Sequence, residues 1–397
     1  MNEVRTQTIR RRRDIGKQRV VIAGGGVAAL EAMLALDQMA DDAVSIVVVC
    51  PSGFFEYRPL AVAEPFDNRA TPRYDLEALL STRGARLVRD AVASVDAPAR
   101  SVELNDGGRL EYDFLLVALG ARPLPGVPGA THFWANSGVQ ELRSLVGALE
   151  EGTVREAAVA VPGGVSWSLP AYELALQAGR RRSAAGAGNR IRLVSPERAP
   201  LEVFGRRIGA AIGDLLHESR VQLVTGTTPA QFVGRSLSLA GGGALDADRV
   251  IALPRLQGPA VPGLPHDADG FIRTDDAGRV EDTERVWAAG DATTFPVKQG
   301  GIAAHHADAA AQSIALAAGV RLDPTPFRPV LRAVLFTGGA PLYMRRRLLD
   351  PADPDGDRAA MARHPFWWPP DKIAGRYLAP FLAAMTPRER RAERGAA

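Results

Sequence analysis

Short apolar runs rich in valine, isoleucine and leucine recur along the chain. The run at residues 20–23 leads through three glycines into an apolar helical segment. Comparable runs lie at 45–50, 114–119 and 191–195. Continuous apolar runs of this length that alternate with helical patterns are typical of strands buried on both faces of a parallel sheet. The pattern therefore predicts an α/β protein.

One region departs from that pattern. Between residues 85 and 113 apolar and polar positions alternate, with turn signals at 96–98 and 105–108. Alternation with a period of two is typical of half-exposed strands. We expect an antiparallel excursion from the parallel sheet here.

The first glycine turn has the form GxGxxA. Gly24 permits the tight turn after the strand, and Gly26 lets the backbone approach a pyrophosphate. Ala29 replaces a third glycine where helix and strand pack closely. The start of the helix then offers free N–H groups and a positive dipole end to the phosphates. This turn predicts a dinucleotide site.

A second strand-turn-helix segment, residues 157–176, has lost the residues that such a site needs. Pro162 occupies the first glycine position and cannot donate an N–H, while Trp167 and Pro170 add bulk. Ser195 ends the next apolar run, where an acidic residue would hold a ribose. We interpret this half as Rossmann-like but unable to bind NAD(P)H in the usual way.

Composition limits the alternatives. The chain has 397 residues, 46% of them apolar, which predicts two or three domains. The net charge is +3, and the basic excess lies in residues 1–19, an arm we interpret as disordered rather than as a nucleic-acid contact. No apolar run reaches the roughly 18 residues of a membrane span. We expect a cytoplasmic protein, and contact with the inner face of the membrane stays open.

Cysteine and histidine usage excludes further chemistry. Cys50 is the only cysteine, so the chain has no intramolecular disulfide, no redox-active cysteine pair and no cysteine-rich metal site. His305 and His306 have no third ligand at a useful spacing. We predict no metal.

Three separated signals identify the chain by resemblance. The intact first turn, the run at 116–120 with its Gly-Ala-Arg-Pro exit, and the run ending at 289–291 occur in one order. In this order they resemble FAD-dependent pyridine nucleotide oxidoreductases, over about 18–320. Residues 55–60 and 298–301 resemble the sulfide:quinone oxidoreductase and type II NADH dehydrogenase branch in particular.

The resemblance implies an FAD cofactor and assigns roles to residues. We expect the FAD to be noncovalent, because no histidine or cysteine in the cofactor loops is placed for attachment. Lys298, Tyr57 and Arg58 are the candidate catalytic residues, with Lys298 near the isoalloxazine or an incoming quinone. The implied cofactor contacts are Gly24, Gly26 and Ala29 at the pyrophosphate, Val92 at the adenine, Gly120 where a strand crosses near the cofactor, and Gly290 and Asp291 at the ribityl chain.

Residue chemistry adds four more cofactor positions. Cys50 stands where such folds usually place a ribose-binding acid, and a thiol is a poor acceptor, so ribose binding must rely on backbone or on Ser52. Gly300 and Gly301 begin a helix whose N–H groups suit the negative charge of a reduced flavin pyrimidine ring. We interpret Cys50 itself as a buried, inert thiol.

The expected organisation is two Rossmann-like domains, the second inserted in the first, plus a C-terminal extension. A basic arm spans residues 1–17. The FAD-binding domain comprises 18–150 and 261–320, a degenerate NAD(P)-binding-like domain comprises 151–260, and the C-terminal region comprises 321–397.

Three functions remain open at this stage. The first is a flavoenzyme that passes electrons to or from a small redox partner such as a quinone, without cysteine-based sulfur chemistry. The second is an NAD(P)H-dependent oxidoreductase with a remodelled middle domain. The third is a flavin-binding sensor or scaffold that does not turn over. A homodimer and peripheral membrane contact through aromatic residues 366–370 also stay open.

Overall fold

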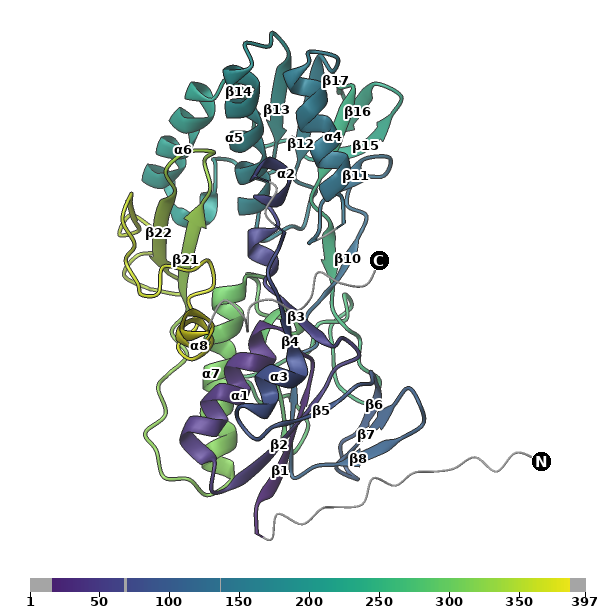
Figure 1. Cartoon of the computed structure of the whole chain (residues 1–397), viewed down its shortest axis with the longest axis vertical. Coiled ribbons are helices and arrows are strands. Elements are labelled where there is room, and N and C mark those ends of the chain that lie inside the picture. Colours follow the sequence, from purple (N-terminus) through teal and green to yellow (C-terminus); the bar gives the residue numbers. More distant parts are fainter. Residues whose placement is uncertain (1–15, 68–69, 136, 386–397) are drawn as a thin grey trace, which may run out of the picture.

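The computed structural model describes residues 16–67, 70–135 and 137–385. Most of the predicted basic arm lies outside these residues. Two parallel sheets lie one above the other along the long axis of the molecule (Figure 1). This arrangement confirms the predicted α/β class with two Rossmann-like sheets.

The first sheet is five-stranded and parallel, in the order β20-β9-β1-β2-β5. Its strands are β1 (Gln18–Ala23), β2 (Val44–Val49), β5 (Arg86–Val88), β9 (Phe114–Val117) and β20 (Val286–Ala288). The chain order reverses at β1, between β9 and β2. Ligands of open α/β sheets bind beyond the carboxyl ends of the strands at such a point.

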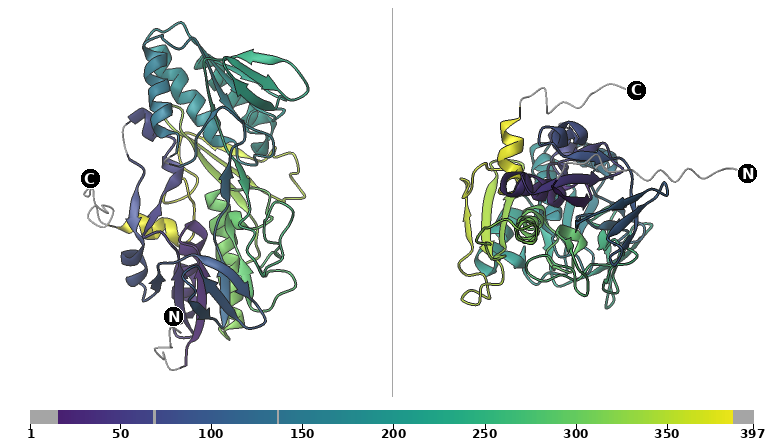
Figure 2. Two further views of the ribbon diagram at one scale, coloured as in Figure 1. Left: turned by 90° about the vertical axis from the view of Figure 1, so that its right-hand side faces the viewer. Right: turned by 90° about the horizontal axis from the view of Figure 1, so that it is seen from below.

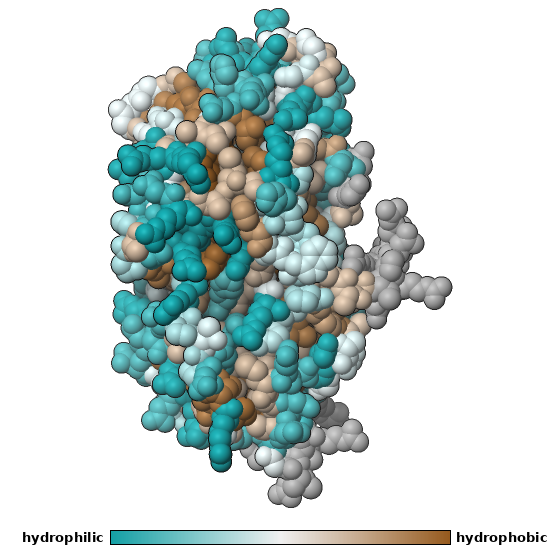
Figure 3. Space-filling model, turned by 90° about the vertical axis from the view of Figure 1, so that its left-hand side faces the viewer, coloured by the Kyte–Doolittle hydropathy of each residue, from teal (hydrophilic) through white to brown (hydrophobic). Residues whose placement is uncertain are grey.

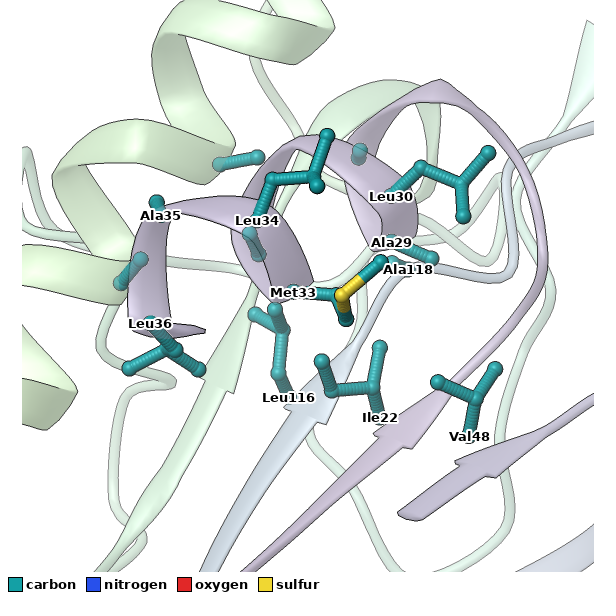
Figure 4. Packing of buried hydrophobic residues seen from close by; sticks show 14 of the residues in the cluster. Ile22, Ala29, Leu30, Met33, Leu34, Ala35, Leu36, Val48, Leu116 and Ala118 are labelled. Atoms are coloured by element: carbon teal, nitrogen blue, oxygen red, sulfur yellow. The ribbon is translucent and has the colours of Figure 1, made fainter. Parts of the chain in front are cut away.

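Helices cover one face of this sheet. They are α1 (Val27–Ala40), α3 (Leu76–Ser81), α7 (Gly300–Ala317) and α8 (Leu378–Ala384). Helices α1 and α7 lie side by side, and buried alanines on α7 permit their close approach. Figure 4 shows Met33 of α1 pointing to Ile22 and Leu116 on the strands. This packing fixes the start of α1 above the carboxyl end of β1.

An antiparallel sheet covers the opposite face, as the alternating pattern predicts. It consists of β6 (Val92–Asp96), β7 (Ser101–Leu104) and β8 (Arg109–Glu111), and its side chains share a core with Val21 and Leu115. A short hairpin, β3 (Phe54–Glu56) with β4 (Arg73–Asp75), flanks the first sheet, and the turns η1 (Arg58–Leu60) and α2 (Glu64–Asp67) lie between its strands.

The second sheet is also five-stranded and parallel, in the order β11-β18-β12-β13-β14, and its strands β18-β12-β13-β14 repeat the arrangement of β9-β1-β2-β5. Its strands are β11 (Thr131–His132), β12 (Glu156–Ala160), β13 (Arg190–Val194), β14 (Val221–Val224) and β18 (Arg249–Ala252). The helices α4 (Val139–Glu150), α5 (Leu169–Ala184) and α6 (Arg206–Glu218) cover one face. The sheet β15 (Pro229–Val233), β16 (Ser236–Leu239) and β17 (Ala244–Asp246) covers the other.

A narrow antiparallel ribbon connects the two parts. The chain leaves the first part through β10 (Arg122–Leu124) and returns through β19 (Arg255–Gln257), and these two strands pair. Because β11 and α4 lie in the second part, that part begins before residue 151, where the sequence pattern had placed its start. The turn η3 (Gly290–Ala292) then follows β20 in the first part.

The C-terminal region joins both parts. The strands β21 (Val330–Leu335), β22 (Leu342–Arg347) and β23 (Ala360–Ala362) form an antiparallel sheet, which packs with the turn η2 (Glu202–Phe204) and the helices of the second part. Helix α8 instead packs against α1 of the first part (Figure 2). On the face of the molecule where β21 and β22 lie, hydrophobic residues form separate patches among hydrophilic ones (Figure 3). No helix of the described residues is long and apolar enough to cross a membrane.

Candidate functional site

A cavity of about 950 Å³ lies between the carboxyl ends of the first sheet's strands, the second glycine turn and the C-terminal segment. Ten of the predicted site residues line it: Gly24, Gly26, Cys50, Ser52, Arg58, Val92, Gly120, Asp291, Lys298 and Gly300. The four others lie behind its wall: Ala29, Tyr57, Gly290 and Gly301. The fold therefore brings together residues that span most of the chain.

The first glycine turn is open on the cavity side and tight on the other. Gly24 has a φ of +123°, and a Cβ there would lie 2.2 Å from the carbonyl oxygen of Ala118. A Cβ on Gly26, which precedes α1, would meet nothing within 4 Å. Gly25, which the fingerprint does not single out, leaves only 2.7 Å between a Cβ and Cys50 Sγ. The turn thus leaves free space beside a helix start, where a pyrophosphate fits.

Cys50 and Ser52 follow β2 at the cavity wall. Burial raises the pKa of the Cys50 thiol, so it stays neutral. The Ser52 hydroxyl donates to the carbonyl of Phe54 at 2.8 Å and accepts the Phe54 N–H at 3.1 Å. Both side chains therefore have local structural roles.

Asp291 presents a carboxylate to the cavity from the turn after β20. Among the described residues, none donates a hydrogen bond to this carboxylate. Burial raises its pKa to about 6, and the charges of Lys298 and Arg58 oppose that shift. A half-buried acceptor without donors suits a hydroxyl-bearing ligand, as the sequence predicts.

Lys298 is held close to Asp291. Its Nζ donates to the carbonyl of Thr293 and lies 3.8 Å from the centre of the Phe271 ring. Burial lowers its pKa to about 8, against the attraction of Asp291. Lys298 therefore supplies a positive charge to the cavity near neutral pH and loses that charge in mild alkali.

Of the two other candidate catalytic residues, Arg58 lines the cavity and Tyr57 does not. Tyr57 is buried behind the cavity wall, where its hydroxyl accepts the N–H of Ile373 at 2.9 Å. Arg58 reaches the cavity, with its guanidinium 5.9 Å from the centre of the Trp134 ring and 3.7 Å from Glu56. Tyr57 can influence a ligand only through the segment that it holds.

A buried ion pair, which the sequence did not predict, faces the cavity. Glu173 of α5 and Lys372 of the C-terminal segment are 1% and 7% exposed, and Lys372 Nζ lies 2.7 Å and 2.8 Å from the two carboxylate oxygens. The ammonium also lies 4.2 Å from the centre of the Phe336 ring. Burial raises the pKa of Glu173 and lowers that of Lys372, and their mutual attraction opposes both shifts.

The second glycine turn lines the same cavity through Gly164, Ser166 and Trp167. Pro162 fits against Gly126, where a Cβ would lie 2.4 Å from the proline ring. The Trp167 ring packs 6.2 Å from that of Phe204. The bulky residues therefore serve packing within the second part.

Glu197, a further residue that the sequence analysis overlooked, closes the ribose end of this second turn. Its carboxylate accepts the Tyr172 hydroxyl at 2.8 Å, the Ser195 hydroxyl at 3.0 Å and the Glu202 N–H at 3.2 Å. The Glu197 carboxylate, the acid nearest the predicted ribose position, therefore already has three hydrogen-bond donors within the protein. The sequence signal that could have found Glu197 is its place two residues after Ser195, where an acidic residue was expected.

Known proteins share this architecture. The solved structure of the sulfide:quinone oxidoreductase from Aquifex aeolicus superposes with a TM-score of 0.78 at 18% identity, covering 87% of this chain and 86% of that one. A demethylphylloquinone reductase of Synechocystis sp. is 26% identical over 69% of this chain and 72% of its own length. The epsilon subunit of an NADH-dependent phenylglyoxylate dehydrogenase from Aromatoleum evansii is 27% identical over 70% of this chain. The chain spans 66% of that subunit's length.

The fold and cavity define a two-domain dinucleotide-binding oxidoreductase. The model of the pyridine nucleotide-disulphide oxidoreductase family matches residues 18–313, and the chain belongs to this family. It is an oxidoreductase, and its cofactor is FAD. The open turn at Gly26 and the donor-free carboxylate of Asp291 fit that cofactor.

Proposed function

We propose that this enzyme passes electrons through noncovalent FAD to a quinone-like acceptor, without cysteine-based sulfur chemistry. The observation that carries the proposal is the Glu173–Lys372 pair at the cavity wall. Reduction of a quinone to a quinol adds two electrons and two protons. Reduced FAD, when bound, would supply the two electrons and one of the protons, so the protein has to deliver the second proton.

The ion pair supplies what an acceptor carbonyl needs. The Lys372 ammonium can donate a hydrogen bond from Nζ to a carbonyl oxygen and pass a proton to it. Glu173 keeps the ammonium charged inside the protein until that transfer. A neutral lysine left beside Glu173 is then reprotonated from solvent.

The cofactor contacts belong to the same proposal. Gly24, Gly26 and Ala29 would form the pyrophosphate side, and Asp291 would accept the ribityl hydroxyls. The remaining contacts are Cys50 and Ser52 near a ribose through their backbone, Val92 at the adenine, Gly120 and Gly290 beside the cofactor, and Gly300 and Gly301 at the pyrimidine end. At the start of α7 the Gln299 side chain accepts the Ile302 N–H, so the glycine N–H groups are the donors left for a ligand.

The relatives' names point the same way. Two of the similar proteins are named for quinone or phylloquinone reduction. Sulfide oxidation is not carried over, because it needs paired cysteines and this chain has Cys50 alone. The donor can therefore differ from that of the sulfide-quinone reductase.

NAD(P)H as donor is the second candidate, and a specific observation favours it. Gly164 and Ser166 line the cavity, and one relative is named as NADH-dependent. Against it stands Glu197, whose carboxylate already accepts three hydrogen bonds. A flavin-binding sensor, the third candidate, would keep FAD without rapid reduction or reoxidation by any partner.

One experiment separates these candidates. The FAD-loaded enzyme is mixed anaerobically with NADH, NADPH, sulfide and a quinol in turn, and flavin absorbance is followed. The reduced enzyme is then mixed with a soluble quinone. Rapid reoxidation by quinone supports the proposal, whereas a flavin inert to every partner supports the sensor.

Peripheral membrane contact forms part of the proposal. Trp368 is 86% exposed, while Trp367 is held by its bond to the Asp371 carbonyl at 3.0 Å. Aromatic side chains of this kind favour the interface between lipid and water. Co-sedimentation with vesicles of phosphatidylcholine and phosphatidylglycerol should fall in Trp368→Ser and stay unchanged in Trp367→Phe.

A further inference from the structure

The C-terminal segment closes one side of the cavity. Residues 371–378, here called the strap, run from the exposed Trp368 region to the start of α8. Lys372 and Ile373 of the strap line the cavity. The position of the strap therefore decides where the Lys372 ammonium stands.

Glu31 fastens the far end of the strap. This residue lies on α1, the helix that begins at the first glycine turn, and it is fully buried. One carboxylate oxygen accepts the Tyr377 N–H at 2.9 Å, and the other accepts the Leu378 N–H at 2.8 Å. The backbone of Gly375 passes so close that a Cβ there would lie 2.4 Å from Glu31.

Few other charged groups surround this carboxyl. Asp308 on α7 faces it and repels its charge, while Arg376 on the strap lies 3.6 Å from Asp308. Tyr377, also on the strap, is the remaining titratable neighbour. Burial is the largest influence and raises the pKa of Glu31 from 4.5 to about 7, although the N–H groups of the strap that bond to the carboxylate act in the opposite direction.

We propose that Glu31 is a positioning residue: by binding the strap it holds Lys372 and Ile373 at the cavity, and it holds them more tightly when protonated. Docking of the strap removes the carboxyl from water, which is costly for the charged form. A detached strap would expose Glu31, whose pKa would then return toward 4.5. Docking is therefore strongest below pH 4.5 and weakens as pH rises to about 7.

The size of the effect follows from the two pKa values. With 4.5 for the exposed group and about 7 for the docked group, the docking equilibrium falls about tenfold between pH 6 and pH 8. Glutamine resembles the protonated acid in shape and in having one carbonyl acceptor. Glu31→Gln should therefore dock nearly equally at both pH values, and Glu31→Ala should dock poorly at both.

Hydrogen exchange of the FAD-loaded enzyme tests this directly. Amide exchange in residues 371–385 is measured at pH 6 and pH 8 and corrected for intrinsic rates. We expect about tenfold faster corrected exchange at pH 8 in the wild type, a lost pH difference in Glu31→Gln and fast exchange at both pH values in Glu31→Ala. Gln38→Ala, at an exposed position of the same helix, should behave as the wild type.

Two results would overturn the proposal. One is a wild-type pH difference that Glu31→Gln retains, and the other is protection that survives Glu31→Ala. If Glu31→Ala fails to fold, comparison of the pH dependence of exchange in the wild type and in Glu31→Gln still tests the proposal. The exchange readout does not depend on the proposed acceptor. A second readout does rest on the proposed function: Glu31→Gln should flatten the pH profile of kcat/KM for quinone between pH 6 and 8.

Discussion

Lys372 Nζ lies within 2.8 Å of both carboxylate oxygens of Glu173, although the two residues stand 199 positions apart. One belongs to a helix of the inserted part and the other to the C-terminal strap. Their pairing ties the second sheet, the C-terminal region and the cavity together. It also places an ammonium at the cavity wall.

Removal of the cation should damage both stability and turnover. Lys372→Met leaves the Glu173 charge buried without a partner, which costs about 3 to 5 kcal/mol unless the carboxyl takes up a proton. Urea unfolding measures the loss, and the rate of reoxidation by quinone should fall at least tenfold. The double variant with Glu173→Gln should recover stability without recovering the rate. A double variant with wild-type rates would show that the pair serves only the fold.

Substitutions at Gly24 and Gly26 should have different effects, one on protein stability and the other on FAD binding. A side chain at Gly26 enters open space, so Gly26→Val should leave the apoprotein folded and abolish FAD retention. Gly24→Ala forces a Cβ against the Ala118 carbonyl and a φ of +123°, so it should lower the melting temperature of the apoprotein itself. Flavin content and thermal unfolding separate the two outcomes. Full flavin retention in Gly26→Val would place the cofactor elsewhere.

Cys50→Ser should leave turnover within a few fold. The thiol is buried and its raised pKa keeps it protonated, so it is a poor nucleophile. Steady-state rates with quinone measure the effect, and flavin content serves as the control. Lost activity with FAD still bound would assign Cys50 a chemical role.

Lys298→Ala should lower the flavin reduction potential, because the lysine charge favours the anionic reduced ring. The pKa of Lys298 is about 8, so its charge is present below that pH and disappears above it. The potentials of variant and wild type should therefore differ at pH 7 and converge as the pH rises beyond 8. A difference that persists in alkali would point to a structural change. Equilibration with redox dyes measures both.

The sequence could predict elements whose residues lie close together in the chain. The first glycine turn and its flanking strand and helix are local, and Gly24 and Gly26 line the cavity as expected. Glu173 and Glu31 gave no such signal, because each stands in an apolar helix and its partner comes from the distant C-terminal region. Tyr57 was assigned to the cavity by its motif, yet its ring faces the strap. Side-chain direction depends on packing that no local pattern contains.

The central claim concerns which partner exchanges electrons with the enzyme, and anaerobic stopped-flow absorbance of the flavin tests it most directly. Since Glu197 and Trp167 are committed to packing within the second part, micromolar NADH or NADPH should bleach the oxidised flavin slowly and without saturation. A soluble quinone should reoxidise the chemically reduced enzyme rapidly. Rapid, saturable bleaching by NADH, together with slow reoxidation by quinone, would contradict the account and make the second glycine turn a working nicotinamide site.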